Sequence, residues 1–304
     1  MTTSTLLVLL LASTLSVSVW LVRHRRQRNG SGAAAKQALG FCDCLLRVMS
    51  SLQQHRGLSS GWLAGDRAFE KRMMAKRLEI DALQAELAPF VAGETAQTRP
   101  CLTSNDLALF RFQWRTLIET LASGNVEQNI ALHSHLIAQV LDWLASVGEA
   151  RIELAAGGVL TPGLVRNYAN RLPALSEYLG QARAIGSSVA ARKGCSAVAR
   201  VRLMFLISRA ESLLEQACAG TDLGIAGEQA KLAVEQMAQT IRDKLLASAG
   251  IALNADTYFT IATRAVDSVL EWTRQCGFQI DRGLAAGAAP KPARFATPNG
   301  ALAE

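Results

Sequence analysis

Apolar residues recur at spacings of three and four along most of the chain, from about residue 37 to residue 284. This spacing places them on one face of an α-helix and predicts an all-α fold. Short stretches rich in glycine, proline, asparagine and serine divide this region into about eight helices. The expected helices cover residues 37–63, 68–90, 104–122, 126–156, 161–192, 197–219, 223–249 and 257–280.

The connections between these expected helices are short. Short connections favour antiparallel neighbours, and four such helices can bury their apolar faces in one bundle. We therefore predict two four-helix bundles, over roughly 37–157 and 162–284, which can share a long helix. Pro173 lies inside the fifth helical pattern, where it predicts a kink or a new helix start.

The amino-terminal residues 6–22, LLVLLLASTLSVSVWLV, contain no charged side chain. The run is at the short end of what crosses a bilayer, and Trp20 stands where interfacial aromatic residues are found. A secretory signal is the rival interpretation, but it needs positive residues before the apolar run and a small-residue cleavage site after it. Here the positive residues follow, so we predict an uncleaved transmembrane helix.

The sequence RHRRQR, residues 23–28, places the following body on the cytoplasmic side, because positive residues flank the cytoplasmic end of membrane helices. We expect a single-pass protein of a bacterial inner membrane, with residues 1–5 outside and a cytoplasmic body. Residues 23–36 form a basic juxtamembrane hinge that includes NGSGAAAK. The segment 285–304 is rich in alanine, proline and glycine, and we expect it to be disordered.

Composition narrows the function further. The net charge of +7 is moderate and much of it lies at 23–28, with no basic stripe among aromatic residues, so nucleic acid is not expected as a partner. The six cysteines form no CxxC pair and the histidines show no ligand spacing relative to them. We therefore predict no metal and no cofactor. The sequence has no GxxxxGK, HExxH or GxSxG motif, so an enzyme is not expected and no catalytic residue is assigned.

Two segments of the body are similar to each other. RGLSSGWLA starts at Arg56 and RAIGSSVAA starts at Arg183. In each, an arginine is followed by a small residue, an aliphatic residue, a cluster of serine and glycine, and then alanine. The similarity suggests two related bundles whose arginines face one another. A chance likeness between helices rich in alanine, serine and glycine is the alternative.

Arginine presents five N–H donors in a planar fork that suits a small oxyanion. Two arginines that face each other repel unless an anion lies between them, so an anion could lock the bundles together. On this hypothesis the glycines and serines after Arg56 make room for the anion and for the second bundle. The alternative is that Arg56 and Arg183 pair with carboxylates, for which Glu177 is available near Arg183.

The residues around these arginines resemble a known family. LQQHRGLSSGWLAGD at 52–66 resembles the signature of the nitrate- and nitrite-sensing domain family, whose helix carries Leu-Gln-x-x-Arg-Gly-x-Ser. LSEYLGQARAIGSSVAARKGCS at 175–196 is similar to its second arginine segment, and 254–271 to its closing helix. The resemblance implies an all-helical sensor that binds nitrate or nitrite between two bundles, with Arg56 and Arg183 as the anion ligands.

Five further residues are weaker ligand candidates. Ser59, Ser60, Ser187 and Ser188 could donate hydroxyl hydrogen bonds, and the serines of the first segment suit packing better. His55 stands where the family has glutamate, and it could protonate and assist an anion or face solvent.

The family domain commonly precedes an output module, and none is recognised in this sequence. We therefore expect a membrane-anchored sensor that signals through an unidentified protein or through self-association as a homodimer. The alternative is a helical scaffold that binds no anion and tethers a partner protein to the membrane.

Overall fold

The computed structural model describes the backbone of residues 3–154, 158, 160–219 and 222–288, and side chains between residues 32 and 286 outside those gaps. This part of the chain is helical and contains no strand, which confirms the predicted all-α class. Its α-helices are α1 Thr3–Leu63, α2 Glu70–Thr95, α3 Ser104–Thr120, α4 Val126–Val147, α5 Pro162–Arg166, α6 Leu172–Arg192, α7 Ala197–Cys218, α8 Gly224–Lys244 and α9 Ala255–Ala288.

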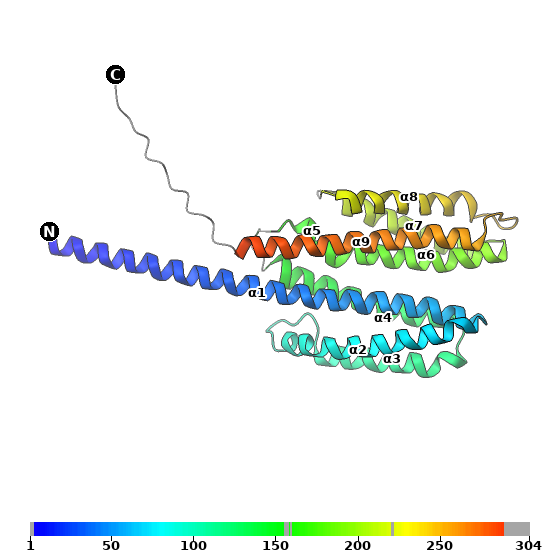
Figure 1. Ribbon diagram of the computed structural model, residues 1–304, viewed down its shortest axis with the longest axis horizontal. Coiled ribbons are helices and arrows are strands. Elements are labelled where there is room, and N and C mark those ends of the chain that lie inside the picture. Colours follow the sequence, from blue (N-terminus) through cyan, green and yellow to red (C-terminus); the bar gives the residue numbers. More distant parts are fainter. Residues whose placement is uncertain (1–2, 155–157, 159, 220–221, 289–304) are drawn as a thin grey trace, which may run out of the picture.

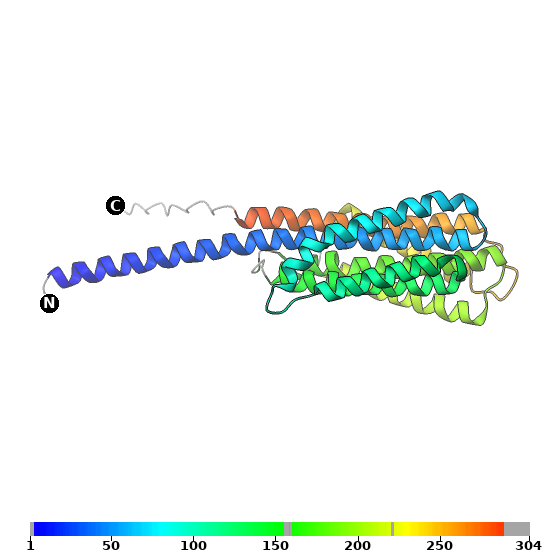
Figure 2. The same ribbon diagram turned by 90° about the horizontal axis from the view of Figure 1, so that it is seen from below.

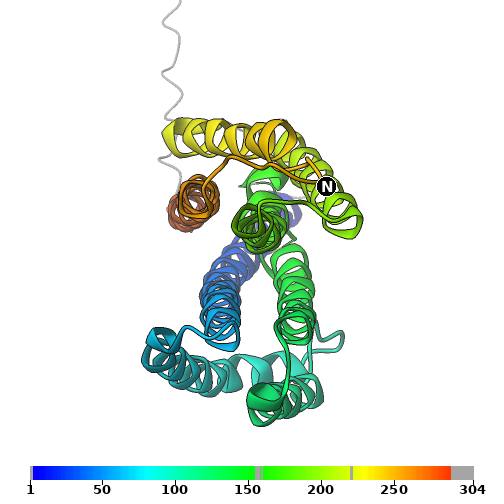
Figure 3. The ribbon, with the colours of Figure 1, turned by 90° about the vertical axis from the view of Figure 1, so that its right-hand side faces the viewer.

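The helices pack lengthwise in two groups (Figure 1). In the first, α1 packs against α2 and α4, and α3 closes the group against α2 and α4. In the second, α6 lies between α7 and α9, and α8 packs against both of those helices. The end-on view separates the groups clearly (Figure 3). They meet where α1 contacts α9 and α6, and where α4 contacts η4 Asn167–Arg171 and α6.

Two π-helical turns lie side by side at one end of the body, η3 Gly148–Glu153 after α4 and η4 Asn167–Arg171 before α6. Their close approach depends on Gly148, because a Cβ there would stand only 2.3 Å from the Cβ of Ala169. The kink or new helix start predicted at Pro173 falls at a change from π- to α-helix, since this proline lies in the first turn of α6 directly after η4, and the backbone stays helical across the change.

Helix α1 is continuous from Thr3 to Leu63, and its amino-terminal half extends beyond the body (Figure 2). The structure therefore differs from the expected hinge at 29–36, which lies within the helix. Two local causes are visible: Ala33, Ala34 and Ala35 favour helix, and Ala35 is already fully buried against the body. Packing between the two groups thus begins before residue 37.

The predicted membrane helix, residues 6–22, lies inside α1, but its side chains fall outside the described part. Among the described residues, one stretch, 126–153, is long and apolar enough to cross a membrane. Its Leu136, Ile137 and Val140 are buried in the first helix group, which is what a core helix of the body shows. Of the expected tail, 285–304, residues 285–288 lie in α9, and residues 289–304 fall outside the described part of the chain.

Candidate functional site

Arg56 of α1 and Glu177 of α6 form an ion pair between the two helix groups. Arg56 Nη1 donates to Glu177 Oε1 at 2.5 Å, and Nη2 donates to Oε2 at 3.1 Å. Both side chains are almost completely buried, with 5% and 7% of their area exposed. This two-pronged geometry is the strongest way in which arginine binds a carboxylate. The carboxylate alternative is therefore correct for Arg56.

Neighbouring polar groups complete this pair. Gln53 Nε2 donates to Glu177 Oε2 at 3.0 Å, and Gln181 Nε2 donates to Oε1 at 2.8 Å. On the other side, Arg56 Nη1 donates to Ser134 Oγ of α4 at 2.9 Å. The small residue beside the guanidinium is Gly180, where a Cβ would lie 3.2 Å from Arg56 Nη2. The Glu177 carboxylate thus accepts four N–H hydrogen bonds in a buried setting.

Arg183 of α6 has different surroundings. Its Nη1 donates to Thr263 Oγ1 of α9 at 3.2 Å, and its guanidinium stands 5.3 Å from the ring centre of Phe259. Among the described residues, no carboxylate lies within ion-pair distance of it. Burial and the nearby charge of Arg56 lower the pKa of Arg183. The Arg183 side chain is therefore a half-buried cation that forms no ion pair with a described carboxylate.

The hydroxyl of Ser187 lies one helical turn after Arg183 on the same face of α6. Its Oγ is buried and has no hydrogen-bond partner among the described residues. An unpartnered buried hydroxyl costs free energy, and a bound water or ion is one way in which such a group is satisfied. Ser188 is exposed on another face of the helix. Arg183 and Ser187 together offer N–H and O–H donors to an anion, whereas Ser188 does not join them.

The glycine and serine cluster after Arg56 serves the first helix group instead. Ser59 Oγ donates to the His55 carbonyl at 2.7 Å, and Asn129 Nδ2 of α4 donates to the hydroxyls of Ser59 and Ser60 at 2.9 Å each. Gly57 faces open space. The serines therefore join α1 to α4 and not to the second bundle, and Gly180 of α6 gives the Arg56 guanidinium its space. Room for an anion beside Arg56 stays a prediction.

His55 is buried and neither faces solvent nor carries a charge. His133 Nδ1 lies 2.8 Å from the Asn129 carbonyl, so this nitrogen is the donor and the other, Nε2, is an acceptor. His55 Nδ1 then donates to His133 Nε2 at 2.8 Å. Burial lowers the pKa of His55 to about 4 and that of His133 to about 3. Both rings are neutral at neutral pH, so His55 adds no charge for an anion.

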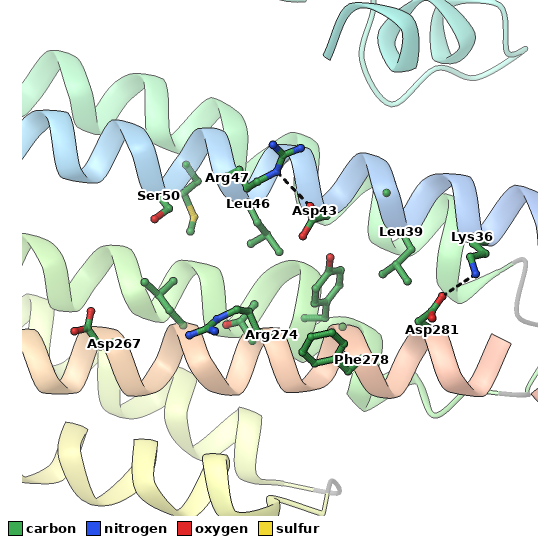
Figure 4. A pocket seen from close by; sticks show the side chains of 16 residues that line it. Lys36, Leu39, Asp43, Leu46, Arg47, Ser50, Asp267, Arg274, Phe278 and Asp281 are labelled. Atoms are coloured by element: carbon green, nitrogen blue, oxygen red, sulfur yellow. Dashed lines mark hydrogen bonds and ion pairs between the residues drawn. The ribbon is translucent and has the colours of Figure 1, made fainter. Parts of the chain in front are cut away.

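A groove of about 840 Å³ runs between α1 and α9 beside the site (Figure 4). Its walls carry Leu39, Leu46 and Phe278, and the ion pair of Lys36 with Asp281 lies at one end. Ser50 and Asp267 line it as well. Ser50 lies one helical turn from Gln53 on α1, and Asp267 lies one helical turn from Thr263 on α9. The groove therefore reaches the neighbourhood of the two arginines.

Sequence analysis identified the arginines but missed their partners. Glu177 was named only as an available carboxylate, and Thr263, Ser134 and Gln53 were not singled out. One signal was present: Gln53 and Glu177 fall on positions that the helical period places inside the body, where uncharged apolar residues are the rule. No group of histidine, cysteine or carboxylate side chains that could hold a metal ion occurs among the described residues.

Comparisons with known proteins give two matches. A family model described as nitrate and nitrite sensing matches residues 47–281. A solved structure, that of the NasR transcription antiterminator, matches at 19% identity with a TM-score of 0.66, over 89% of this chain and 75% of that chain. At this identity the second match establishes a similar fold. The comparison with curated proteins gives no match. Because the family model covers most of the chain, this protein belongs to the nitrate and nitrite sensing family.

Proposed function

We propose that this chain is a sensor that binds nitrate or nitrite between its two helix groups, with Arg56 and Arg183 as the principal cations. The observation that carries this proposal is the state of Arg183. Its guanidinium is half-buried, and no carboxylate of the described residues lies within ion-pair distance of it. The hydroxyl of Ser187, which has no hydrogen-bond partner among the described residues, lies one helical turn away. A small planar oxyanion would neutralise the first group and accept a hydrogen bond from the second.

The two helix groups suit this role as two four-helix bundles, over roughly 37–157 and 162–284, that share the α1–α6–α9 boundary. An anion at this boundary contacts both bundles, so it stabilises one relative placement over others. A ligand shifts a conformational equilibrium only through such a difference in affinity. The groove between α1 and α9 is the element whose width we expect to change when the anion binds.

We further propose that residues 6–22 anchor the chain in a bacterial inner membrane with the body in the cytoplasm, followed by a juxtamembrane segment at 23–36 and ending in a tail at 285–304. The change in the bundles would then reach a partner protein, or a second copy of the chain, through α1 and α9. Both helices run the length of the body and lie next to each other at Lys36 and Asp281. The anion is the only small-molecule ligand in this proposal.

A second candidate function also has an observation in its favour. The bidentate pair of Arg56 with Glu177 joins the two helix groups through side chains of this chain alone. A chain of this kind could serve as a helical scaffold that tethers a partner protein to the membrane. The scaffold alternative predicts that no anion changes the stability of the protein.

The two functions are separated by isothermal titration of the purified full-length chain with nitrate, nitrite, chloride and sulfate. The sensor predicts saturable heat with nitrate or nitrite, and its loss in a folded Arg183→Ala variant. A control is Arg209→Ala, which alters an exposed arginine that also lies over an aromatic ring, that of Tyr178. No heat and no thermal shift at millimolar nitrate or nitrite would exclude the sensor and leave the scaffold.

A further inference from the structure

The charges at the boundary between the helix groups do not cancel. Two guanidinium groups, those of Arg56 and Arg183, lie close enough for their charges to repel. One buried carboxylate, Glu177, lies with them. Two positive charges and one negative charge leave a single net positive charge. His55 and His133 do not alter this sum at neutral pH, because burial keeps both rings neutral.

Other charged groups near the site stand in water. Asp267 of α9 acts on Arg183 but is exposed, and Arg77 of α2 acts on His55 but is partly exposed, with 42% of its side chain in solvent. Solvent and salt screen charges of this kind, whereas buried charges are screened much less. The buried groups therefore dominate the charge that a ligand meets at the boundary.

Glu177 is held so that it cannot easily turn away from this site. Four N–H donors fix its two oxygens, two from Arg56 and one each from Gln53 and Gln181. Hydrogen bonds to the ionised form favour that form. Arg56 meanwhile still has its Nε hydrogen and one Nη2 hydrogen that no described residue accepts. The carboxylate thus removes one charge from the site without removing all of its donors.

We infer that Glu177 is a specificity-determining residue, which sets the net charge of the site to a single positive charge so that it accepts a monovalent oxyanion and rejects a divalent one. This inference rests on the proposed anion site. A nitrate or nitrite ion brings the buried charges to neutrality. A sulfate ion also accepts hydrogen bonds from such donors, but its second negative charge would remain unneutralised at this buried boundary. An unneutralised buried charge costs free energy.

The test compares nitrate and sulfate binding to the full-length chain by isothermal titration at constant ionic strength, in wild type and in Glu177→Gln. The variant removes the negative charge and keeps the size of the side chain. We expect affinity for sulfate relative to nitrate to rise by about tenfold or more, since the net positive charge of the site doubles. An unchanged ratio in a folded variant that still binds nitrate would overturn the inference.

Glu211→Gln is the matched control. Glu211 also forms a two-pronged pair with an arginine of the second helix group, Arg242, but the pair is exposed and lies on α7 and α8. We expect this variant to leave the nitrate-to-sulfate ratio as in wild type. A change equal to that of Glu177→Gln would show a general charge effect and would also overturn the inference.

A second variant covers the case in which Glu177→Gln does not fold. Gln181 is partly exposed and donates to Glu177, so Gln181→Glu adds a negative charge beside the same guanidinium without burying it fully. We expect nitrate affinity to fall by about fivefold or more, because the net charge drops to zero. Unchanged nitrate affinity would count against the role of charge.

The same titrations separate this inference from the proposed function. If the wild-type chain binds neither nitrate nor nitrite, the sensor proposal fails. Gain of sulfate or nitrate binding by Glu177→Gln in that case would still support the role of Glu177. If no variant binds any anion, both proposals fail.

Discussion

Arg56 and Arg183 begin two similar sequence segments, yet their surroundings are opposite. Arg56 is buried with a carboxylate that accepts two of its hydrogen bonds. Arg183 is half-buried, donates to a hydroxyl and stands over an aromatic ring. Arg56 joins the two helix groups through Glu177, whereas Arg183 has no carboxylate within ion-pair distance among the described residues. Two similar segments thus place their arginines in different surroundings, and the proposed anion site draws mainly on the arginine without a carboxylate partner.

The glycines of the two segments differ in the same way. In the second segment, a Cβ on Gly186 would lie 2.4 Å from the ring of Tyr258, which is fully buried. In the first segment, Gly57 has nothing within 4 Å. The second segment therefore needs Gly186 so that α6 can approach α9, whereas no neighbour requires a glycine at position 57. The other glycine of the first segment, Gly61, lies against the ring of Phe69, which would stand 2.6 Å from a Cβ there.

The largest effect is expected for Arg56→Ala. This change leaves the carboxylate of Glu177 buried without its counter-charge, which costs about 3–5 kcal/mol of unfolding free energy. Urea denaturation of the full-length chain measures it. Arg242→Ala is the control, because it breaks an exposed pair, for which about 1 kcal/mol or less is expected. Equal losses in the two variants would contradict the structural role of Arg56.

The stability of the protein is expected to depend strongly on pH through the two histidines near Arg56. The pKa values of His55 and His133 fall from 6.5 to about 4 and about 3 on folding, so the unfolded chain takes up protons first in acid. Above pH 6.5 both rings are neutral in the folded and the unfolded chain, so they leave the free energy of unfolding unchanged. As pH falls from 6.5 towards the folded-state pKa values, the free energy of unfolding decreases by up to about 1.4 kcal/mol per pH unit for each ring.

Thermal unfolding between pH 7 and 4.5 checks this expectation. His133→Gln should flatten the acid-side fall, while His135→Gln, at an exposed histidine of the same helix, should leave it unchanged. A slope that is the same in wild type and His133→Gln would contradict the buried neutral pair.

The glycine comparison gives a smaller effect of opposite sign. Gly186→Ala overpacks the α6–α9 contact and should cost about 1–3 kcal/mol. Gly57→Ala replaces an unobstructed glycine in a helix interior and should stabilise the protein by up to about 1 kcal/mol. Urea denaturation of the two variants side by side measures both. Stabilisation by Gly186→Ala would show that the close approach of Tyr258 is not required.

The smallest change in stability is expected for Arg183→Ala. It removes a contact with the Phe259 ring, which is worth about 0.5–1 kcal/mol, but also relieves repulsion from Arg56. We expect a net change below about 1 kcal/mol by urea denaturation, together with loss of anion binding. A loss as large as that of Arg56→Ala would mean that Arg183 is a structural residue too.

The sequence predicted the helices and the two arginines because both depend on local patterns: a helical period, breakers, and a short motif. It did not predict that α1 passes unbroken through 29–36, because that depends on burial of Ala35 in the core formed by segments distant in sequence. Nor could it choose which arginine Glu177 would pair with. Glu177 lies close to Arg183 in sequence, but the crossing of α1 over α6 brings it to Arg56 instead.

The serines illustrate the same limit. Four serines were candidates because each has a hydroxyl that can donate a hydrogen bond, and only their tertiary contacts distinguish them. Ser59 and Ser60 accept hydrogen bonds from Asn129 of α4, and Ser188 is exposed. Of these four serines, Ser187 alone has a buried oxygen without a hydrogen-bond partner among the described residues. The position of a hydroxyl on a helix face depends on which helix packs there, and that is a tertiary property.

A crystal structure of the full-length chain with nitrate, at concentrations that saturate it in titration, tests the central claim most directly. The account predicts a planar anion between α6 and α1, in hydrogen-bond contact with the guanidinium of Arg183 and the Ser187 hydroxyl, with Arg56 and Glu177 still paired beside it. Nitrate bound elsewhere, with the surroundings of Arg183 and Ser187 unchanged, would contradict it.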